Sequence, residues 1–203
     1  MQLVLGSSSP YRKALLEKLG LPFVCHSPDI DESREAGESP VALVERLAVE
    51  KARETGRFFP DGLIIGSDQV AVLDGKIVTK PRDHADAVNQ LREASGREVK
   101  LYTGLCLYNA GSGSVQRGVE TYSVVFRDLN AQQIEAYLQK DQPYNCAGSL
   151  KSESLGIAML SKLVGDDPNT LIGLPLIRLV DLSLIHISEP TRLESKSRMP
   201  AWA

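Results

Sequence analysis

The sequence predicts an α/β domain with a mixed β-sheet, and three observations support this. Short apolar segments typical of strands alternate with amphipathic segments of helical period along the chain. Leu63-Ile64-Ile65 is apolar at every position, as expected for a strand covered on both faces. Asp74-Gly75 lies between two strand-like segments, which predicts a tight antiparallel hairpin.

The first element is a strand over 3–5, followed by a polar turn over 6–9 and a helix over 10–20. Ser9 is a favourable N-cap, and Pro10 suits the first helical position because no backbone donor is needed there. The positive end of this helix therefore faces the polar turn.

This turn has the composition of a phosphate cradle. Ser7 and Ser8 supply hydroxyl groups, and Arg12 places a guanidinium, which binds two oxygens at once, in the first helical turn. An ordinary capped helix after a strand explains the same serines, so only Arg12 favours the phosphate site.

The remaining elements follow from apolar period and from start and stop residues. A second helix begins at Ser39-Pro40 and carries Lys51 late in its length, and a third ends at Ser95-Gly96. Further strands are expected over 23–25, 63–65, 70–73, 76–79, 99–108 and 119–126. Helices are expected over 39–52, 83–95 and 131–139.

A second polar turn is expected over 66–69, directly after the apolar strand. Its Asp68 is suited to orient or deprotonate a water or to bind a divalent cation, although an aspartate that caps the turn is the structural alternative. The hairpin pairs Leu73 with Lys76 and, continued outward, Gln69 with Lys80. Strict alternation then places Asp68 and Lys80 on opposite faces of the hairpin, so both can contact one ligand only if a bulge or the end of regular pairing intervenes.

Three basic residues, Arg12, Lys51 and Lys80, and two acidic ones, Glu32 and Asp68, lie in or beside polar turns. A nucleoside triphosphate carries about four negative charges, so its cleavage needs several cations and a divalent ion held by carboxylates. Each residue also has a structural alternative, since Glu32 belongs to an acidic loop that solvent would cover and Lys51 suits a helix surface.

Composition limits the classes of function. The chain has 203 residues, of which 42% are hydrophobic, enough for one sizeable core. A net charge of -3 argues against nucleic-acid or anionic-membrane binding, and no apolar run approaches the ~20 residues of a membrane span, so cytoplasmic localisation is expected. The three histidines are scattered, and the three cysteines lack a CxxC pair and are expected to be buried, reduced thiols.

Taken together and in order, these motifs resemble the Maf family over residues 1–181. They are Ser7-Ser8-Ser9-Pro10 with Arg12, Asp31-Glu32, Glu50-Lys51-Ala52, Gly66-Ser67-Asp68-Gln69, Lys80-Pro81, Cys146-Ala147-Gly148-Ser149 and Gly173-Leu174-Pro175-Leu176. The resemblance implies an elongated α/β fold shared with inosine triphosphatase-like enzymes, and members of the family are often homodimers. It also implies a nucleoside triphosphate pyrophosphatase, in which water attacks the α-phosphorus of a small-molecule nucleotide.

The resemblance further implies roles for single residues. Asp68 matches the catalytic acidic position, and Glu32 joins it in binding a divalent cation, Mg²⁺ or Mn²⁺. Phosphate binding is implied for a set of polar and basic residues, namely Ser7, Ser8, Arg12, Lys51 and Lys80.

Tyr11, Gln69 and Glu153 match three positions that distinguish the branch hydrolysing 7-methyl-GTP. A cationic 7-methylguanine ring is attracted to an aromatic face, and Glu153 suits the guanine N1–H and N2–H₂ donors. Tyr11 stands where a tryptophan is expected, whereas Lys151-Ser152-Glu153-Ser154 lacks the glutamine of the branch that hydrolyses dTTP and UTP. That branch and a non-catalytic regulator of cell division are the alternatives, and intact Asp68, Lys51 and Lys80 argue against the regulator.

The C-terminal segment 182–203 breaks the preceding pattern, where a helix begun after Leu174-Pro175-Leu176 should continue. Its residues resemble a translation of a transposase-based sequencing adapter. We therefore expect this segment, including His186 and Trp202, to be a non-native tail without function, packed poorly or disordered. A genuine, divergent C-terminus is the alternative.

Overall fold

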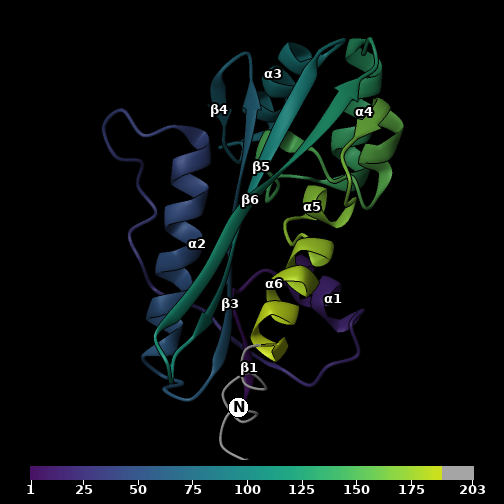
Figure 1. The fold of residues 1–203 in the computed structure, drawn as a ribbon. Helices are drawn as coiled ribbons and strands as arrows, with labels where there is room; N and C mark the ends of the chain where they lie inside the picture. The colour runs from purple at the N-terminus through teal and green to yellow at the C-terminus, as the bar shows by residue number, and fades with distance from the viewer. Residues whose placement is uncertain (189–203) are drawn as a thin grey trace, which may run out of the picture.

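One seven-stranded sheet runs along the molecule in a computed structural model that describes residues 1–188 (Figure 1). Its strands are β1 Leu3–Gly6, β2 Val24–His26, β3 Leu63–Leu73, β4 Lys76–Val78, β5 Glu98–Asn109, β6 Ser114–Phe126 and β7 Leu160–Val164. The helices are α1 Pro10–Glu17, α2 Pro40–Gly56, α3 His84–Ala94, α4 Ala131–Asp141, α5 Asn169–Ile172 and α6 Leu176–Ser188, with short 3₁₀ helices η1 Ala147–Ser149 and η2 Leu155–Met159.

The sheet is mixed, which confirms the predicted fold class. Its order is β2-β1-β3-β5-β6-β7, with β4 paired to β3 outside this path. Strand β1 is parallel to β2 and β3, whereas the pairs β3–β4, β3–β5, β5–β6 and β6–β7 are antiparallel. The long strands β3, β5 and β6 give the molecule its elongated shape (Figure 1).

Three apolar clusters pack on the two faces of this sheet. Helix α2 covers one face, where its residues pack against Ile64 and Cys106. On the opposite face, α1 and α6 pack near Ile65 at one end, and α3 and α4 pack near Leu73 at the other. The opposite face therefore carries two groups of helices, with the short helix α5 between them (Figure 1).

The predicted start signals act as expected. The Ser9 hydroxyl accepts a hydrogen bond from the Arg12 backbone N–H at 3.3 Å, and the Ser39 hydroxyl accepts one from Ala42 at 3.1 Å. Pro10 and Pro40 are the first residues of α1 and α2. Because both caps satisfy otherwise unpaired N–H groups, they fix where the two helices begin.

The predicted hairpin is also confirmed at its turn. Asp74 and Gly75 adopt φ values of 49° and 78°, and Leu73 pairs with Lys76. The pairing ends at β4, whose last residue is Val78, so the outward pair expected between Gln69 and Lys80 does not form.

The predicted polar turn over 66–69 is wrong, because these residues belong to the middle of β3. Strand β5 pairs with β3 along its whole length, which keeps the segment extended. Gly66 is required for another reason, because a Cβ at this position would collide with the carbonyl oxygen of Ala48 in α2. Likewise, a Cβ on Gly104 of β5 would collide with the carbonyl oxygen of Val44 in α2. Both glycines therefore allow α2 to approach the sheet closely.

We expect Gly66→Ala to lower the free energy of unfolding by about 1–3 kcal/mol, the usual cost of overpacking. The added methyl group would meet the backbone of α2, which cannot move aside as a flexible side chain can. Urea denaturation measures this, with Gly111→Ala as control because its new Cβ would have ordinary contacts, the first at 3.6 Å. Equal losses in the two variants would contradict the close-approach explanation.

The cysteines differ in environment. Cys106 is buried, and its burial raises the pKa of the thiol to about 12. Cys25, expected to be buried, is instead exposed, because it lies on β2 at the edge of the sheet. The residues described here contain no helix with both the length and the apolar character that a membrane span requires.

At the C-terminal end, α6 continues the helix predicted after Leu174-Pro175-Leu176 and extends past residue 182 to Ser188. Leu182 is only 3% exposed and packs in the same cluster as Leu179. The boundary at 182 stays a prediction, and residues 189–203 of the suspected tail lie outside the described residues.

Candidate active site

A cavity of about 530 Å³ lies beside a gap in the edge of β3. On this edge β1 pairs with residues 63–66 of β3, and β4 pairs with residues 71–73. Residues 67–70 between these two partners are paired on the other edge only, with β5. The cavity is lined by residues of α1, β3 and α2, by the loop before η1, and by the segment after it.

Side chains from both faces of the sheet reach the cavity through this gap. Alternation along β3 directs Asp68 to the α2 face, and Ser67 and Gln69 to the face that carries α5. The hydrogen bonds agree, since Asp68 contacts Lys51 of α2, whereas Gln69 contacts Thr170 of α5. Alternation therefore does not prevent Asp68 and Lys80 from lining one cavity, since regular pairing ends before Lys80.

Lys51 bridges two carboxylates at the α2 side of the cavity. Its Nζ lies 2.7 Å from Asp68 Oδ1 and 2.8 Å from Glu32 Oε1. Lys51 is only 7% exposed and Asp68 8%, so the surface-lysine alternative is wrong. Glu32 comes from an exposed loop, yet its carboxylate joins this group. The structure thus brings together three of the predicted site residues.

The serine-rich turn lies next to this group. The Ser7 hydroxyl oxygen accepts hydrogen bonds from the Ser9 N–H at 3.2 Å and from Arg12 Nη1 at 3.4 Å. The Arg12 guanidinium also donates through Nε to the carbonyl oxygen of Gly173 at 2.9 Å. Among residues 1–188 the Ser7 hydroxyl proton and the Arg12 Nη2 group have no hydrogen-bond partner, so both can donate to an anion.

Burial lowers the pKa of Arg12, while the neighbouring carboxylates of Asp68 and Glu32 act in the opposite direction. The Arg12 guanidinium keeps its charge at neutral pH, because arginine does not deprotonate in proteins. It therefore supplies a fixed positive charge close to the two carboxylates.

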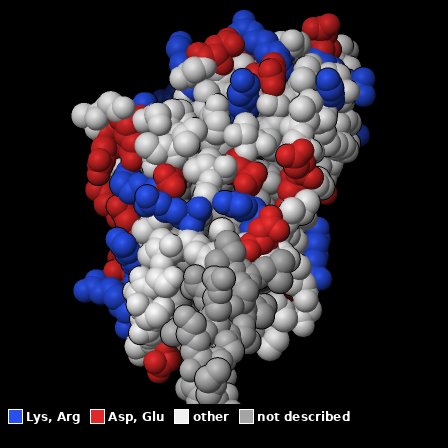
Figure 2. Space-filling view, viewed as in Figure 1, with Lys and Arg blue, Asp and Glu red and all other residues white. Residues whose placement is uncertain are grey.

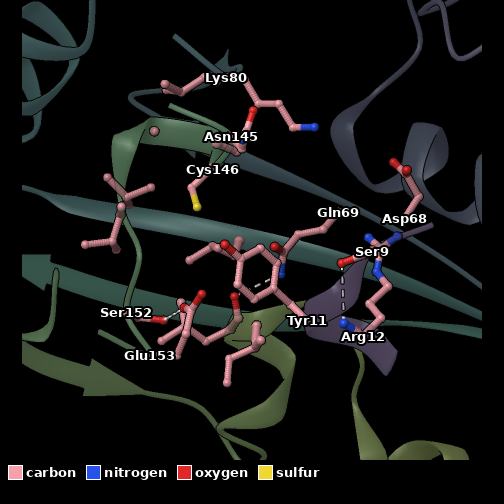
Figure 3. Close-up of a pocket in the computed structure, with 18 of the residues that line it drawn as sticks. Ser9, Tyr11, Arg12, Asp68, Gln69, Lys80, Asn145, Cys146, Ser152 and Glu153 are labelled. Atoms are coloured by element: carbon pink, nitrogen blue, oxygen red, sulfur yellow. Dashed lines mark hydrogen bonds between the residues drawn. The ribbon is translucent and has the colours of Figure 1, made fainter. Parts of the chain in front are cut away.

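Tyr11 and Glu153 lie at the other end of the cavity from Arg12 and Asp68, with Gln69 between (Figure 3). Burial, followed by the nearby Cys146 thiol and Glu153 carboxylate, raises the pKa of the Tyr11 hydroxyl. Burial also raises the pKa of Cys146. This end of the cavity thus combines an aromatic ring, a protonated thiol and an exposed carboxylate.

Gln69 is held by its amide nitrogen. Nε2 donates to the Thr103 hydroxyl at 2.8 Å and to the Thr170 carbonyl oxygen at 2.7 Å. Its amide oxygen is the group left to face a ligand.

The profile of the family described as Maf-like protein matches residues 2–184. The chain belongs to this family. Among its relatives, 7-methyl-GTP pyrophosphatases of Colwellia psychrerythraea and Nitrosococcus oceani are 55% and 57% identical over 184 and 180 residues. These matches cover 91% and 89% of this chain, and 92% and 90% of the relatives.

Lys80 and Ser8 are the remaining predicted site residues, and both also line the cavity of this Maf-like protein. Both are exposed, and Lys80 makes no ion pair with the described residues. Beside Lys80, the Thr79 carbonyl oxygen accepts hydrogen bonds from the Gly148 N–H at 3.2 Å and from Gln90 Nε2 at 3.3 Å. Gln90 also accepts a hydrogen bond from the Ser149 hydroxyl at 2.7 Å.

Sequence reasoning missed several of these supporting residues. The carbonyl groups of Thr170 and Gly173 accept hydrogen bonds from Gln69 and Arg12. The Gly173-Leu174-Pro175 motif is the feature of the sequence that could have indicated a role for this segment. Gln90 joins the Lys80 loop to η1, but a single glutamine in an amphipathic helix carries no signal of such a role.

The site offers two carboxylates as ligands for a hard divalent cation, which is part of the oxygen ligand set that such an ion needs. Glu32 and Asp68 supply carboxylate oxygens on either side of Lys51 Nζ. In the described part of the chain no three His, Cys, Asp or Glu side chains come together as a metal site. Mg²⁺ is commonly bound by one or two carboxylates together with substrate phosphates, so two carboxylates suffice for that mode.

Proposed function

We propose that this Maf-like protein hydrolyses 7-methyl-GTP to 7-methyl-GMP and pyrophosphate. One observation carries the proposal: a single cavity joins a carboxylate–lysine–carboxylate group and a cationic serine-rich turn to an aromatic and acidic end. The first part suits a triphosphate and the second a cationic guanine base. The names of the relatives agree with this reaction.

In the proposed reaction Asp68 orients and deprotonates the water that attacks the α-phosphorus. Arg12, Lys51 and Lys80 bind the phosphates, with hydrogen bonds from Ser7 and Ser8. Glu32 and Asp68 would hold Mg²⁺ or Mn²⁺, which supplies charge neutralisation of the phosphates when bound. Lys51 is then placed to contact both the carboxylates and the incoming phosphates.

The base is recognised at the other end of the cavity. The Tyr11 ring offers its face to the cationic 7-methylguanine, an attraction of about 0.5–2 kcal/mol. The Glu153 carboxylate accepts hydrogen bonds from the guanine N1–H and N2–H₂ donors, whereas uracil and thymine present carbonyl groups on the matching edge. The Gln69 amide oxygen lies between the two ends.

The test is pyrophosphate release from 7-methyl-GTP, GTP, UTP, CTP and dTTP, each with Mg²⁺ or Mn²⁺. Preferred turnover of 7-methyl-GTP supports the proposal. Preferred turnover of UTP or dTTP would keep the reaction and overturn the base preference. A folded protein that hydrolyses none of the five would overturn the enzymatic function.

We expect Glu153→Lys to lower kcat/KM for 7-methyl-GTP by about 10- to 100-fold, because a charge-assisted hydrogen-bond acceptor becomes a repelling cation. The kcat/KM for UTP should change by less than about threefold, since UTP gains nothing from the carboxylate. The control is Glu98→Lys, which makes the same charge change at an exposed position that does not line the cavity. Equal losses for both nucleotides would contradict a role of Glu153 in base selection.

A small-molecule partner agrees with the surface. Lys and Arg side chains alternate with Asp and Glu on the face seen in Figure 2, and the net charge is -3. We therefore propose a nucleotide rather than a nucleic acid as ligand. Action in the cytoplasm and assembly as a homodimer are further parts of the proposal, and sedimentation of the purified chain tests the second.

A further inference from the structure

Two carbonyl groups of the short helix α5 and its following turn hold side chains at the phosphate-binding end and in the middle of the cavity. The Gly173 carbonyl oxygen accepts hydrogen bonds from Arg12 Nε and from the Ser67 hydroxyl, each at 2.9 Å. The Thr170 carbonyl oxygen accepts from Gln69 Nε2 at 2.7 Å and from the Thr103 hydroxyl at 3.1 Å. One four-residue segment thus orients a phosphate-binding group and a base-facing group.

The conformation of this segment leaves little freedom. Gly173 has a φ of 111°, a value that other residues rarely adopt, and its N–H donates back to the Asn169 and Thr170 carbonyl oxygens at 3.1 Å. A Cβ on Gly173 would lie 3.3 Å from Arg12 Nε. The turn is therefore shaped to let the guanidinium reach the backbone.

A buried carboxylate holds the segment in place. Asp167 is only 6% exposed, and its Oδ1 accepts hydrogen bonds from the Asn169 N–H at 2.8 Å and from Asn169 Nδ2 at 2.6 Å. Its Oδ2 accepts from the N–H of Ile177 at the start of α6, at 2.8 Å. The carboxylate thereby ties the beginning of α5 to the beginning of α6, on both sides of the Gly173 turn.

We propose that Asp167 is a positioning residue that sets phosphate binding and base recognition together, through the carbonyl groups of Thr170 and Gly173. It lies outside the residues that line the nucleotide cavity, so it acts through Arg12 and Gln69 and not on the substrate. The inference rests on the proposed function for its choice of ligands. It extends that function by giving the Gly173-Leu174-Pro175 motif a role.

The test separates the two ends of the substrate. Calorimetry measures binding of inorganic triphosphate, which reports on the phosphate end, and of 7-methyl-GMP, which reports mainly on the base end. Arg12→Ala should weaken triphosphate binding most, and Gln69→Ala 7-methyl-GMP binding most. Asp167→Ala should weaken both ligands about tenfold, the factor expected when one hydrogen bond at each end is misplaced.

A second readout does not depend on any nucleotide. The Arg12 Nε–H proton donates to the Gly173 carbonyl, so its NMR signal, assigned by its loss in Arg12→Lys, should shift and exchange faster in Asp167→Ala. The control Asn130→Ala removes a helix cap of α4, where Asn130 accepts from the Gln133 N–H at 2.9 Å, and it leaves the α5 turn intact. It should lower stability without changing the Arg12 signal or either affinity.

The outcomes decide the proposal. An unchanged Arg12 signal, a loss of affinity for one ligand alone, or equal effects of Asp167→Ala and Asn130→Ala would each overturn it. Where Asp167→Ala does not fold, Asp167→Asn makes the same test, since it keeps one acceptor and loses the charge. If the wild type hydrolyses another nucleotide, the proposed function fails separately, and the monophosphate of that nucleotide replaces 7-methyl-GMP.

Discussion

Asp68→Asn is expected to lower kcat for pyrophosphate release from 7-methyl-GTP by about 10³-fold. The amide has nearly the shape of the carboxylate but cannot take a proton from the attacking water, and general-base catalysis contributes about 10²- to 10⁴-fold. Lys51 still has Glu32 as a partner at 2.8 Å, so the variant should fold. Pyrophosphate release under saturating nucleotide measures the effect on kcat separately from binding.

The matched control is Asp74→Asn. Asp74 is an exposed aspartate that pairs with Arg97 at 2.7 Å, and its φ of 49° suits asparagine well. This variant makes the same chemical change outside the cavity and should keep full activity. Residual kcat above about a tenth of wild type in Asp68→Asn would argue against Asp68 as the base.

Much of the site could be predicted from sequence because its signals are local. The strand, the serine-rich turn and the capped helix of residues 3–17 follow one another directly. The Ser9 cap accepts its hydrogen bond from Arg12, only three positions later in the chain. The turn at Asp74-Gly75 is local in the same way. Glu32, Lys51 and Asp68 are grouped because each lies in or beside a predicted polar turn, and the family resemblance then implies their roles.

The errors came from contacts between distant segments. The sequence predicts Gly66 in a turn, but in the structure this glycine lets α2 approach the sheet at Ala48, which lies 18 residues earlier in the chain. The exposure of Cys25 depends on β2 being an edge strand, and sheet order is not visible in the sequence. The gap between β1 and β4 along β3 is likewise a property of the assembled sheet, and it decides which side chains share the cavity.

Removal of the Lys51 charge is expected to have the second large effect. Lys51→Met keeps the length of the buried stem but leaves Asp68, which is 8% exposed, without the ammonium at 2.7 Å. Breaking a buried pair by removing one partner costs about 3–5 kcal/mol, and the open cavity, which admits water, should reduce this cost to about 2–3 kcal/mol. We also expect a fall in kcat/KM of at least about 10²-fold, because a cation proposed to bind the substrate phosphates is lost.

Urea denaturation and pyrophosphate release of Lys51→Met, Asp68→Asn and the double variant measure how far the two residues act as one unit. The double variant should be more stable than Lys51→Met, because no unpaired carboxylate remains at position 68. Its activity should be close to that of Asp68→Asn alone, since residues that serve one step are not additive. Strictly additive losses in both measurements would mean that Lys51 and Asp68 contribute independently, and that their 2.7 Å contact adds nothing to stability or to activity.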